Sequence, residues 1–331
     1  MEPWILALCI VLLGLVFDYT NGFHDAANVV STVIATRVLA PLTAIVLAGV
    51  LNTIGATQIS AVAQTITSGL VNSLGVTQIT ILCAIIGAII WNILTWYYGI
   101  PSSSSYALVG GLIGATWTSV GLQEILWNGV VYKVVIPMIA SPLIGYFLAL
   151  AFMKVLYAYQ KNSKKNERLF GHLQIGSASI IALSHGINDA QKSMGLITLG
   201  LLASKIITTQ SIPLWVILAC AITMGLGTAS GGVRIIKTVG FSITKLQTMQ
   251  GFAAEMSASC VILTASFLGM PISSTHMIVG SVTGVGAAKG MHAVSWGIMK
   301  KLSVAWALTL PGSALIASLF TFILEWVLPK L

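Results

Sequence analysis

Charged residues are scarce in this sequence, and their scarcity excludes a water-soluble fold. Asp, Glu, Lys and Arg make up only 7% of the 331 residues, whereas hydrophobic residues make up 56%. Soluble domains carry about 25% charged residues. Sixteen basic residues outnumber eight acids, for a formal net charge of +8. We attribute this excess to cytoplasmic loops of a membrane protein rather than to nucleic-acid binding.

Cysteine pairs and enzyme motifs are lacking as well. The four cysteines stand singly in apolar runs with no CxxC spacing, which excludes a disulfide framework and a cysteine metal site. The sequence has no HExxH, GxSxG or P-loop pattern. The neighbours Ser184 and His185 do not by adjacency form a nucleophile–base pair. We therefore expect neither an enzyme nor a bound cofactor.

Long apolar runs are what the sequence has instead. Segments such as LTAIVLAGVL and ITILCAIIGAII approach the roughly 20 residues that a helix needs to cross a bilayer. In lipid, the backbone must be hydrogen-bonded within a helix or a closed barrel, and these runs lack the alternation of barrel strands. The sequence predicts an all-α polytopic membrane protein.

The chain contains two similar halves. The segment GFHDAAN at 22–28 matches GINDAQK at 186–192, and GIPSSSSYALVGG at 99–111 matches GMPISSTHMIVGS at 269–281. Matches that recur in the same order are typical of an internal duplication.

The loop charges predict that the two halves are inverted. A basic segment, residues 157–172, is expected to be a cytoplasmic linker between a first transmembrane repeat, 1–156, and a second, 173–331. Residues 67–78 carry no charge, whereas the equivalent residues 233–247 carry three basic residues. Because basic loops stay in the cytoplasm, these two segments should face opposite sides. Inverted repeats are typical of secondary transporters.

Each serine cluster predicts a break between two helices. In both, an apolar run ends at Gly, Pro and hydroxyl residues follow, and a new apolar run begins. Pro and Ser suit the first turn and the cap of a helix, so we expect a re-entrant hairpin at each cluster. Helix starts attract anions, and two converging starts would form an uncharged site for a small oxyanion. The alternative is a polar kink that only helps helices to pack.

Acids and amides recur at matched positions within apolar stretches. A carboxylate at the bilayer centre costs roughly 2.5–3.5 kcal/mol and needs a partner. Asp25 and Asn28 lie on one helix face, and Asn188 and Asp189 occupy the corresponding place in the second half. Their oxygens suit a hard cation such as sodium. Glu255 is a further acid within an apolar stretch.

Two alternatives to a sodium site stay open. Asp25, Asp189 or Glu255 could carry a proton, and His24, which adjoins Asp25, could relay protons near neutral pH. Alternatively, Asp189 could form an internal ion pair with Lys192, one helix turn further along.

The sequence resembles the PiT family of inorganic phosphate transporters. The resemblance rests on the two Asp signatures, the paired Pro-Ser/Thr loops and the segments GGVRIIKTVG and GFAAEMSAS, and it runs from about Trp4 to Pro311. It implies an inverted-repeat symporter with about 12 membrane segments including the two hairpins. Such a protein forms a homodimer in the bacterial inner membrane and imports inorganic phosphate with sodium or protons.

Carried over position by position, the resemblance assigns two sets of residues. Those implied to bind phosphate are Ser103, Ser104, Ser105, Ser273, Ser274 and Thr275. Those implied to couple transport to a cation are His24, Asp25, Asn28, Asn188, Asp189 and Glu255. If the cation is sodium, its ligands come from Asp25, Asn28, Asn188 and Asp189.

Departures from the family pattern favour protons over sodium. Asn52 stands where sodium-driven animal members carry an acid, and Lys192 replaces a neutral amide. The forms FHD and NDxQK are similar to those of proton-driven bacterial members. In some such members the substrate is a neutral complex of phosphate with a divalent metal.

Other functions are compatible with the same residues. Hydrogen-bond donors at an uncharged site do not distinguish phosphate from another oxyanion such as sulfate. A passive anion channel is disfavoured, because buried acids repel anions unless a cation accompanies them.

The inverted arrangement predicts sidedness. Residues 157–172 and 234–245 should be cytoplasmic, and residues 67–78 should be external, because basic loops remain in the cytoplasm. Labelling of single introduced cysteines with an impermeant reagent from each side measures this. Labelling of residues 67–78 from the cytoplasm would refute the inverted repeat.

Overall fold

The structure is a computed structural model that describes residues 3–159 and 163–327. These residues are helical apart from turns and one isolated β-bridge between Val71 and Ile125. The prediction of an all-α protein is confirmed.

The helices of the first half are α1 (Pro3–Ala35), α2 (Pro41–Ala56), α3 (Ala61–Ser68), α4 (Gln78–Tyr97), α5 (Ser104–Ser119), α6 (Trp127–Val130) and α7 (Ile136–Tyr159). Those of the second half are α8 (Ser163–Ala203), α9 (Leu214–Ser230), α10 (Val233–Lys237), α11 (Thr248–Phe267), α12 (Ser274–Lys289) and α13 (Trp296–Val327). Short π-turns continue α6 into α7 at Val131–Val135 and extend α10 at Thr238–Ser242. Short 3-10 turns at Leu122–Glu124 and Met291–Ala293 follow α5 and α12.

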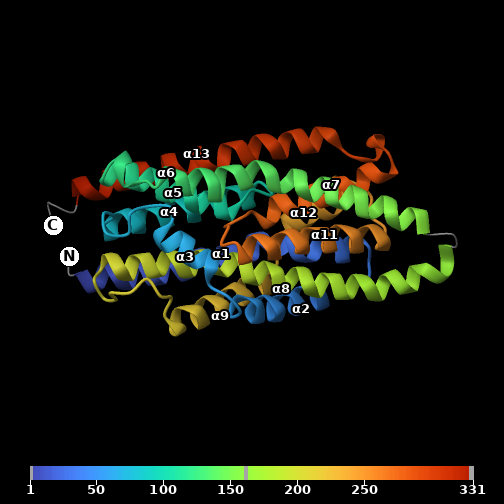
Figure 1. The fold of residues 1–331 in the computed structure, drawn as a ribbon, viewed down its shortest axis with the longest axis horizontal. Helices are drawn as coiled ribbons and strands as arrows, with labels where there is room; N and C mark the ends of the chain where they lie inside the picture. The colour runs from blue at the N-terminus through green and yellow to red at the C-terminus, as the bar shows by residue number, and fades with distance from the viewer. Residues whose placement is uncertain (1–2, 160–162, 328–331) are drawn as a thin grey trace.

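The two halves repeat the same order of elements. Each has a long helix, a bent pair, a helical hairpin, a 3-10 turn and a final helix with an internal proline, Pro142 in α7 and Pro311 in α13. The first helices of the halves, α1 and α8, pack side by side and run in opposite directions, while α1 begins and α13 ends at the same end of the molecule (Figure 1).

Helix lengths set which elements can cross a bilayer. By length and composition, four helical segments within residues 3–159 and 163–327 qualify: α1, α4, α6 continued into α7, and α13. The number rises to six if the bent pairs α2–α3 and α9–α10 each count as one span. Helices α5 and α12 have 16 residues each, about 24 Å at the helical rise, which is shorter than a hydrocarbon core. Such lengths suit the arms of a hairpin.

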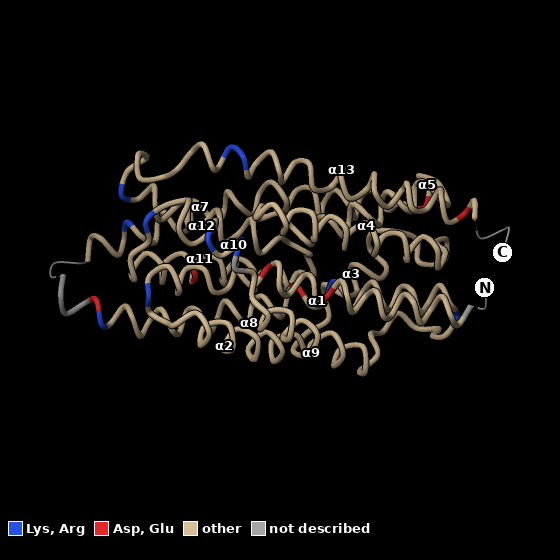
Figure 2. The backbone as a smooth tube through the Cα atoms, turned by 180° about the vertical axis from the view of Figure 1, so that it is seen from behind, with Lys and Arg blue, Asp and Glu red and all other residues tan. Residues whose placement is uncertain are grey.

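The predicted basic linker is largely helical. Residues 157–159 end α7, and residues 163–172 form the first turns of α8; residues 160–162 lie outside the described part of the chain. Most lysines and arginines gather at the end of the molecule that includes this connection, opposite the start of α1 (Figure 2).

The surface is largely apolar, and the interior holds many polar groups among apolar clusters. Large hydrophobic side chains such as Leu42, Leu315 and Phe322 are exposed, whereas Asp25, Asp189 and many hydroxyl side chains are buried. This distribution suits a lipid environment, in which the outer surface contacts acyl chains and polar groups must find partners inside.

Glycines allow the hairpin arms to pack against helices of the opposite half. Helix α5 packs against α13, and α12 packs against α7. A Cβ atom on Gly110 would overlap the backbone carbonyl of Leu310, and one on Gly280 would overlap that of Pro142. Small residues therefore set the closeness of these membrane helices.

Close approach at Gly280 predicts a loss of stability on substitution. Gly280→Ala should destabilise the protein by about 1–3 kcal/mol, because the added methyl group forces α12 away from α7. Thermal unfolding in detergent measures the loss. Gly297→Ala in α13 is the control, because nothing lies within 4 Å of its new Cβ. Equal melting temperatures for Gly280→Ala and Gly297→Ala would contradict this account.

Candidate functional site

Two equivalent helix starts define the site. Gly99 and Gly269 both have φ of +65° and end the first arm of their hairpins. Ser103 and Ser273 then cap the second arms: their side chains accept hydrogen bonds, both of 3.2 Å, from the backbone N–H groups three residues on. Each cap is made because Ser holds an extended conformation and supplies an oxygen to an otherwise unpaired N–H group.

The two hairpin turns meet in the interior. Ser105 Oγ, in the first turn of α5, donates a hydrogen bond of 3.2 Å to the carbonyl of Ile272, just before α12. Ser104, Ser105, Ser274 and the next residue, Thr275, are all 2% exposed or less. The starts of α5 and α12 therefore present hydroxyls and helix N-termini to one buried region.

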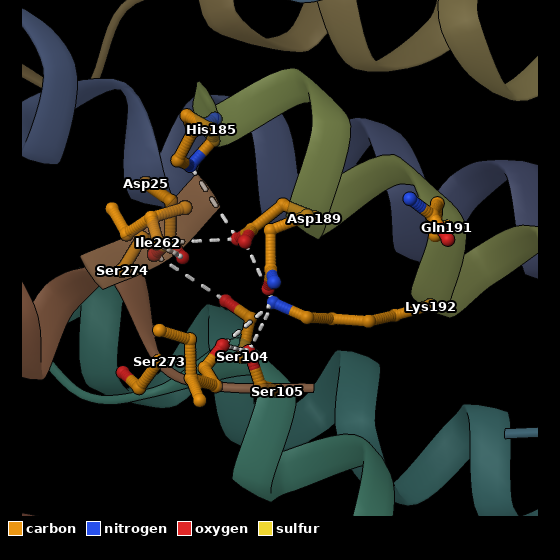
Figure 3. A network of polar contacts seen from close by, with 12 residues as sticks. Asp25, Ser104, Ser105, His185, Asp189, Gln191, Lys192, Ile262, Ser273 and Ser274 are labelled. Carbon is orange, nitrogen blue, oxygen red and sulfur yellow. Dashed lines mark hydrogen bonds and ion pairs between the residues drawn. The ribbon is translucent and has the colours of Figure 1, made fainter. Parts of the chain in front are cut away.

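Asp25 of α1 and Asp189 of α8 reach this region together. The hydroxyl of Ser274 lies 3.5 Å from Asp25 Oδ2 and 3.3 Å from Asp189 Oδ2, so its single proton can serve either carboxylate. Ser104 Oγ lies 3.5 Å from Asp25 Oδ1. Figure 3 shows Asp25, Asp189 and the serines converging on one another; they come from α1, α8 and the starts of α5 and α12.

Asn28 and Lys192 tie the long helices to the hydroxyl turns. Asn28 Nδ2 donates to Thr275 Oγ1 at 2.8 Å and to Ser274 Oγ at 3.2 Å. Lys192 Nζ donates to Ser105 Oγ at 2.5 Å and forms an ion pair of 2.6 Å with Asp189. The internal ion pair that the sequence left open is therefore present. Figure 3 shows Lys192 pointing into the cluster.

A histidine accompanies each aspartate. His24 Nδ1 pairs with Asp25 Oδ1 at 2.6 Å, and His24 Nε2 lies 3.2 Å from Thr95 Oγ1. His185 Nε2 lies 3.4 Å from Asp189 Oδ2. His185 is absent from the residues assigned by sequence, although its position four residues before Asp189 places both on one helix face.

The donor set could hold a cation. One ligand atom each from Asp25, His185 and Asp189 lies within 4.8 Å of the others, and all three residues are buried. The amide oxygens of Asn28 and Asn188 have no hydrogen-bond partner among the described residues. Carboxylate and amide oxygens are ligands for hard cations, and imidazole can hold or relay a proton.

Two predicted residues make their hydrogen bonds with groups other than the aspartates and the hairpin serines. Asn188 donates to Ser266 Oγ at 2.8 Å. Glu255 of α11 is buried and accepts a hydrogen bond of 2.6 Å from Thr32 and one of 3.1 Å from Gln174, and Ser177 also donates to it. Glu255 therefore connects α11 to α1 and α8, and its hydrogen bonds go to neither aspartate.

The fold and this centre define a multi-pass membrane protein with a buried, polar, charge-bearing site. The profile of the phosphate transporter family matches residues 21–317. The chain belongs to the phosphate transporter family, which confirms the resemblance seen in the sequence; the family is one of transporters, so the chain is not an enzyme.

Bacterial relatives match nearly the whole chain. A protein of Bacillus subtilis is 40% identical over 98% of this chain and 98% of its own length, and one of Rhizobium meliloti is 41% identical over 96% of each. A protein of Mycobacterium bovis is 44% identical over 96% of this chain and 77% of its own length. All three are named "Probable low-affinity inorganic phosphate transporter".

A solved structure has the same fold. It is described as "The sodium-dependent phosphate transporter", and its TM-score is 0.88 at 24% sequence identity. The match covers 98% of this chain and 100% of the solved chain.

Proposed function

We propose that the protein imports inorganic phosphate by symport with a cation, through alternating access. The observation that carries the proposal is the meeting of the capped starts of α5 and α12 beside two buried aspartates. Membership of the phosphate transporter family and the names of the relatives supply the substrate.

The phosphate site proposed here is rich in hydroxyl donors and lies beside the charged side chains of Asp25, Asp189 and Lys192. Ser104, Ser105, Ser274 and Thr275 offer hydroxyls to phosphate oxygens, while Ser103 and Ser273 hold the helix starts in place through their caps. Free N–H groups in the first turns and the positive ends of the helix dipoles favour an anion. Because hydroxyls carry no charge, the anion can also leave, as transport requires.

Alternating access follows from the duplicated fold. Helices α1 and α8 pack against each other in opposite directions (Figure 1). We propose that the two halves are inverted across the bacterial inner membrane and that the α4–α5 and α11–α12 pairs are re-entrant hairpins. Rocking of packed elements around a central site then opens it to each side in turn. The protomer is proposed to work as a homodimer.

The coupling ion proposed here is the proton. His24 and Asp25 form a buried pair at 2.6 Å, and His185 stands 3.4 Å from Asp189. A histidine next to a carboxylate can pass a proton to it and take one from it. Sodium, named in the description of the solved relative, is the second candidate. The unpaired oxygens of Asn28 and Asn188 would supply its ligands together with the aspartates. Glu255, which links α11 to α1 and α8, is proposed to couple helix movement to the cation.

Other oxyanions would meet the same donors. Sulfate has the same tetrahedral oxygens, and a complex of phosphate with a divalent metal would bring compensating positive charge to Asp25 and Asp189. Competition of radiolabelled phosphate uptake by sulfate, and its dependence on added divalent metal, separates these substrates. A passive anion channel is the remaining alternative, and it would show no dependence on an imposed cation gradient.

Removal of one hydroxyl from the proposed phosphate site is expected to weaken phosphate binding. Ser274→Ala or Ser104→Ala removes one hydrogen bond to a charged oxygen, worth about 1.5–3 kcal/mol, so apparent phosphate affinity should fall roughly ten- to a hundredfold. Concentration dependence of uptake into proteoliposomes measures the change. Ser303→Ala, on the exposed face of α13, is the control. Unchanged affinity in both site variants would place the phosphate site elsewhere.

The His24–Asp25 pair predicts that the proton is the coupling ion. Uptake should be driven by an inward proton gradient without sodium, and Asp25→Asn should abolish the response to that gradient, because the variant keeps the shape but removes the titrating group. Proteoliposomes with imposed proton or sodium gradients distinguish the ions. Uptake that stays at background until sodium is added would overturn proton coupling and leave the phosphate assignment intact.

A further inference from the structure

Lys192 carries a charge that its counterpart in the first repeat lacks. We propose that the Lys192 ammonium group is a tethered cation that fills the cation position of the second repeat, so that only the position beside Asp25 exchanges cations with solvent. The proposal rests on the symport function proposed above and assigns to Lys192 the control of which cations, and how many, the site accepts.

The internal repeat places Lys192 and Asn28 at the same position. Each is the third residue after the aspartate of its repeat. Asn28 donates to Thr275 Oγ1 at 2.8 Å, and Lys192 donates to Ser105 Oγ at 2.5 Å. Thr275 and Ser105 are also equivalent, since each stands two residues after the capping serine of its hairpin. The same hydrogen bond is thus made twice, once by a neutral amide and once by a cation.

The ligands of the ammonium group are those of a metal cation. Lys192 Nζ contacts a carboxylate oxygen of Asp189 at 2.6 Å, the hydroxyl of Ser105 at 2.5 Å and the carbonyl of Ile272 at 3.1 Å. Carboxylate, hydroxyl and carbonyl oxygens are what a hard cation takes, and an ammonium group has three donors to satisfy all three. The side chain is fully buried, and its tether to α8 prevents release with the substrate.

The charge balance of the cluster fits one exchangeable cation. Ligand atoms of Asp25 and Asp189 lie within 4.8 Å of each other, and two carboxylates that close need compensation in a buried site. Lys192 compensates Asp189, whereas Asp25 has a neighbouring histidine and, among the described residues, no ion pair with a lysine. A single proton or metal ion beside Asp25 therefore completes the balance.

Replacement of Lys192 by asparagine tests the proposal. Lys192→Asn gives the second repeat the amide of the first, and Lys192→Gln is a second variant with a longer side chain. Thermal unfolding in detergent is compared in sodium chloride and choline chloride without phosphate. Lys205→Asn is the matched control, because Lys205 is exposed just after α8 and has a φ of 57° that Asn tolerates.

Both site variants should gain a sodium-specific rise in melting temperature beyond any shown by the wild type, and Lys205→Asn should not. Sodium should also stimulate their phosphate uptake about tenfold, the factor that one charge-assisted interaction supplies. Variants that respond to sodium no more than the wild type does would overturn the proposal. A variant that folds only when purified in sodium supports it, and one that fails to fold in sodium and choline alike contradicts it.

The experiments test the tethered cation and the transport function independently of each other. The melting measurement contains no phosphate, so a missing sodium response in the variants refutes the tethered cation whatever the protein transports. Absence of phosphate uptake by the wild type refutes the transport function, while a sodium response of the variants would still stand.

Discussion

The burial of two carboxylates is the constraint on which the centre of the molecule depends. A carboxylate in a low-dielectric interior must have hydrogen-bond donors or a counter-charge. Several elements supply these partners to Asp25 and Asp189. Each aspartate has a histidine on its own helix, and both lie within reach of the hydroxyl of Ser274. The hydroxyls at the starts of α5 and α12 supply part of these donors.

Duplication alone does not explain the site, because the two copies have diverged in charge. Equivalent backbone positions carry Asn28 in one half and Lys192 in the other, and both reach a hydroxyl in the hairpin of the opposite half. The hydroxyl of Ser274 lies within reach of both aspartates. The centre is therefore shared between the halves, and a change in one half alters the electrostatics of the other.

The sequence predicted the class of fold and singled out Asp25, Asp189 and the two serine clusters, because a buried acid or a serine cluster is conspicuous in an apolar chain and the repeat shows each twice. Contacts across the repeat were harder to predict. The bond from Lys192 to Ser105 joins residues 87 positions apart, and local pattern carries no information on such a pair. His185 was missed because it recurs in no repeated motif. Ser103 caps α5, whereas its neighbour Ser104 lies near Asp25. The sequence could not assign these two roles, because they depend on the backbone conformation of each serine.

Packing between α5 and α13, and between α12 and α7, has a consequence for what moves. Each hairpin arm lies against the last helix of the other half, at glycines that bring backbone against backbone. The packed units of this protein therefore do not coincide with its sequence halves: each combines a hairpin arm from one repeat with the last helix of the other. A half synthesised alone would expose the glycine faces that the other half normally covers. The two repeats must therefore complete their folding together, because each is packed into the other rather than beside it.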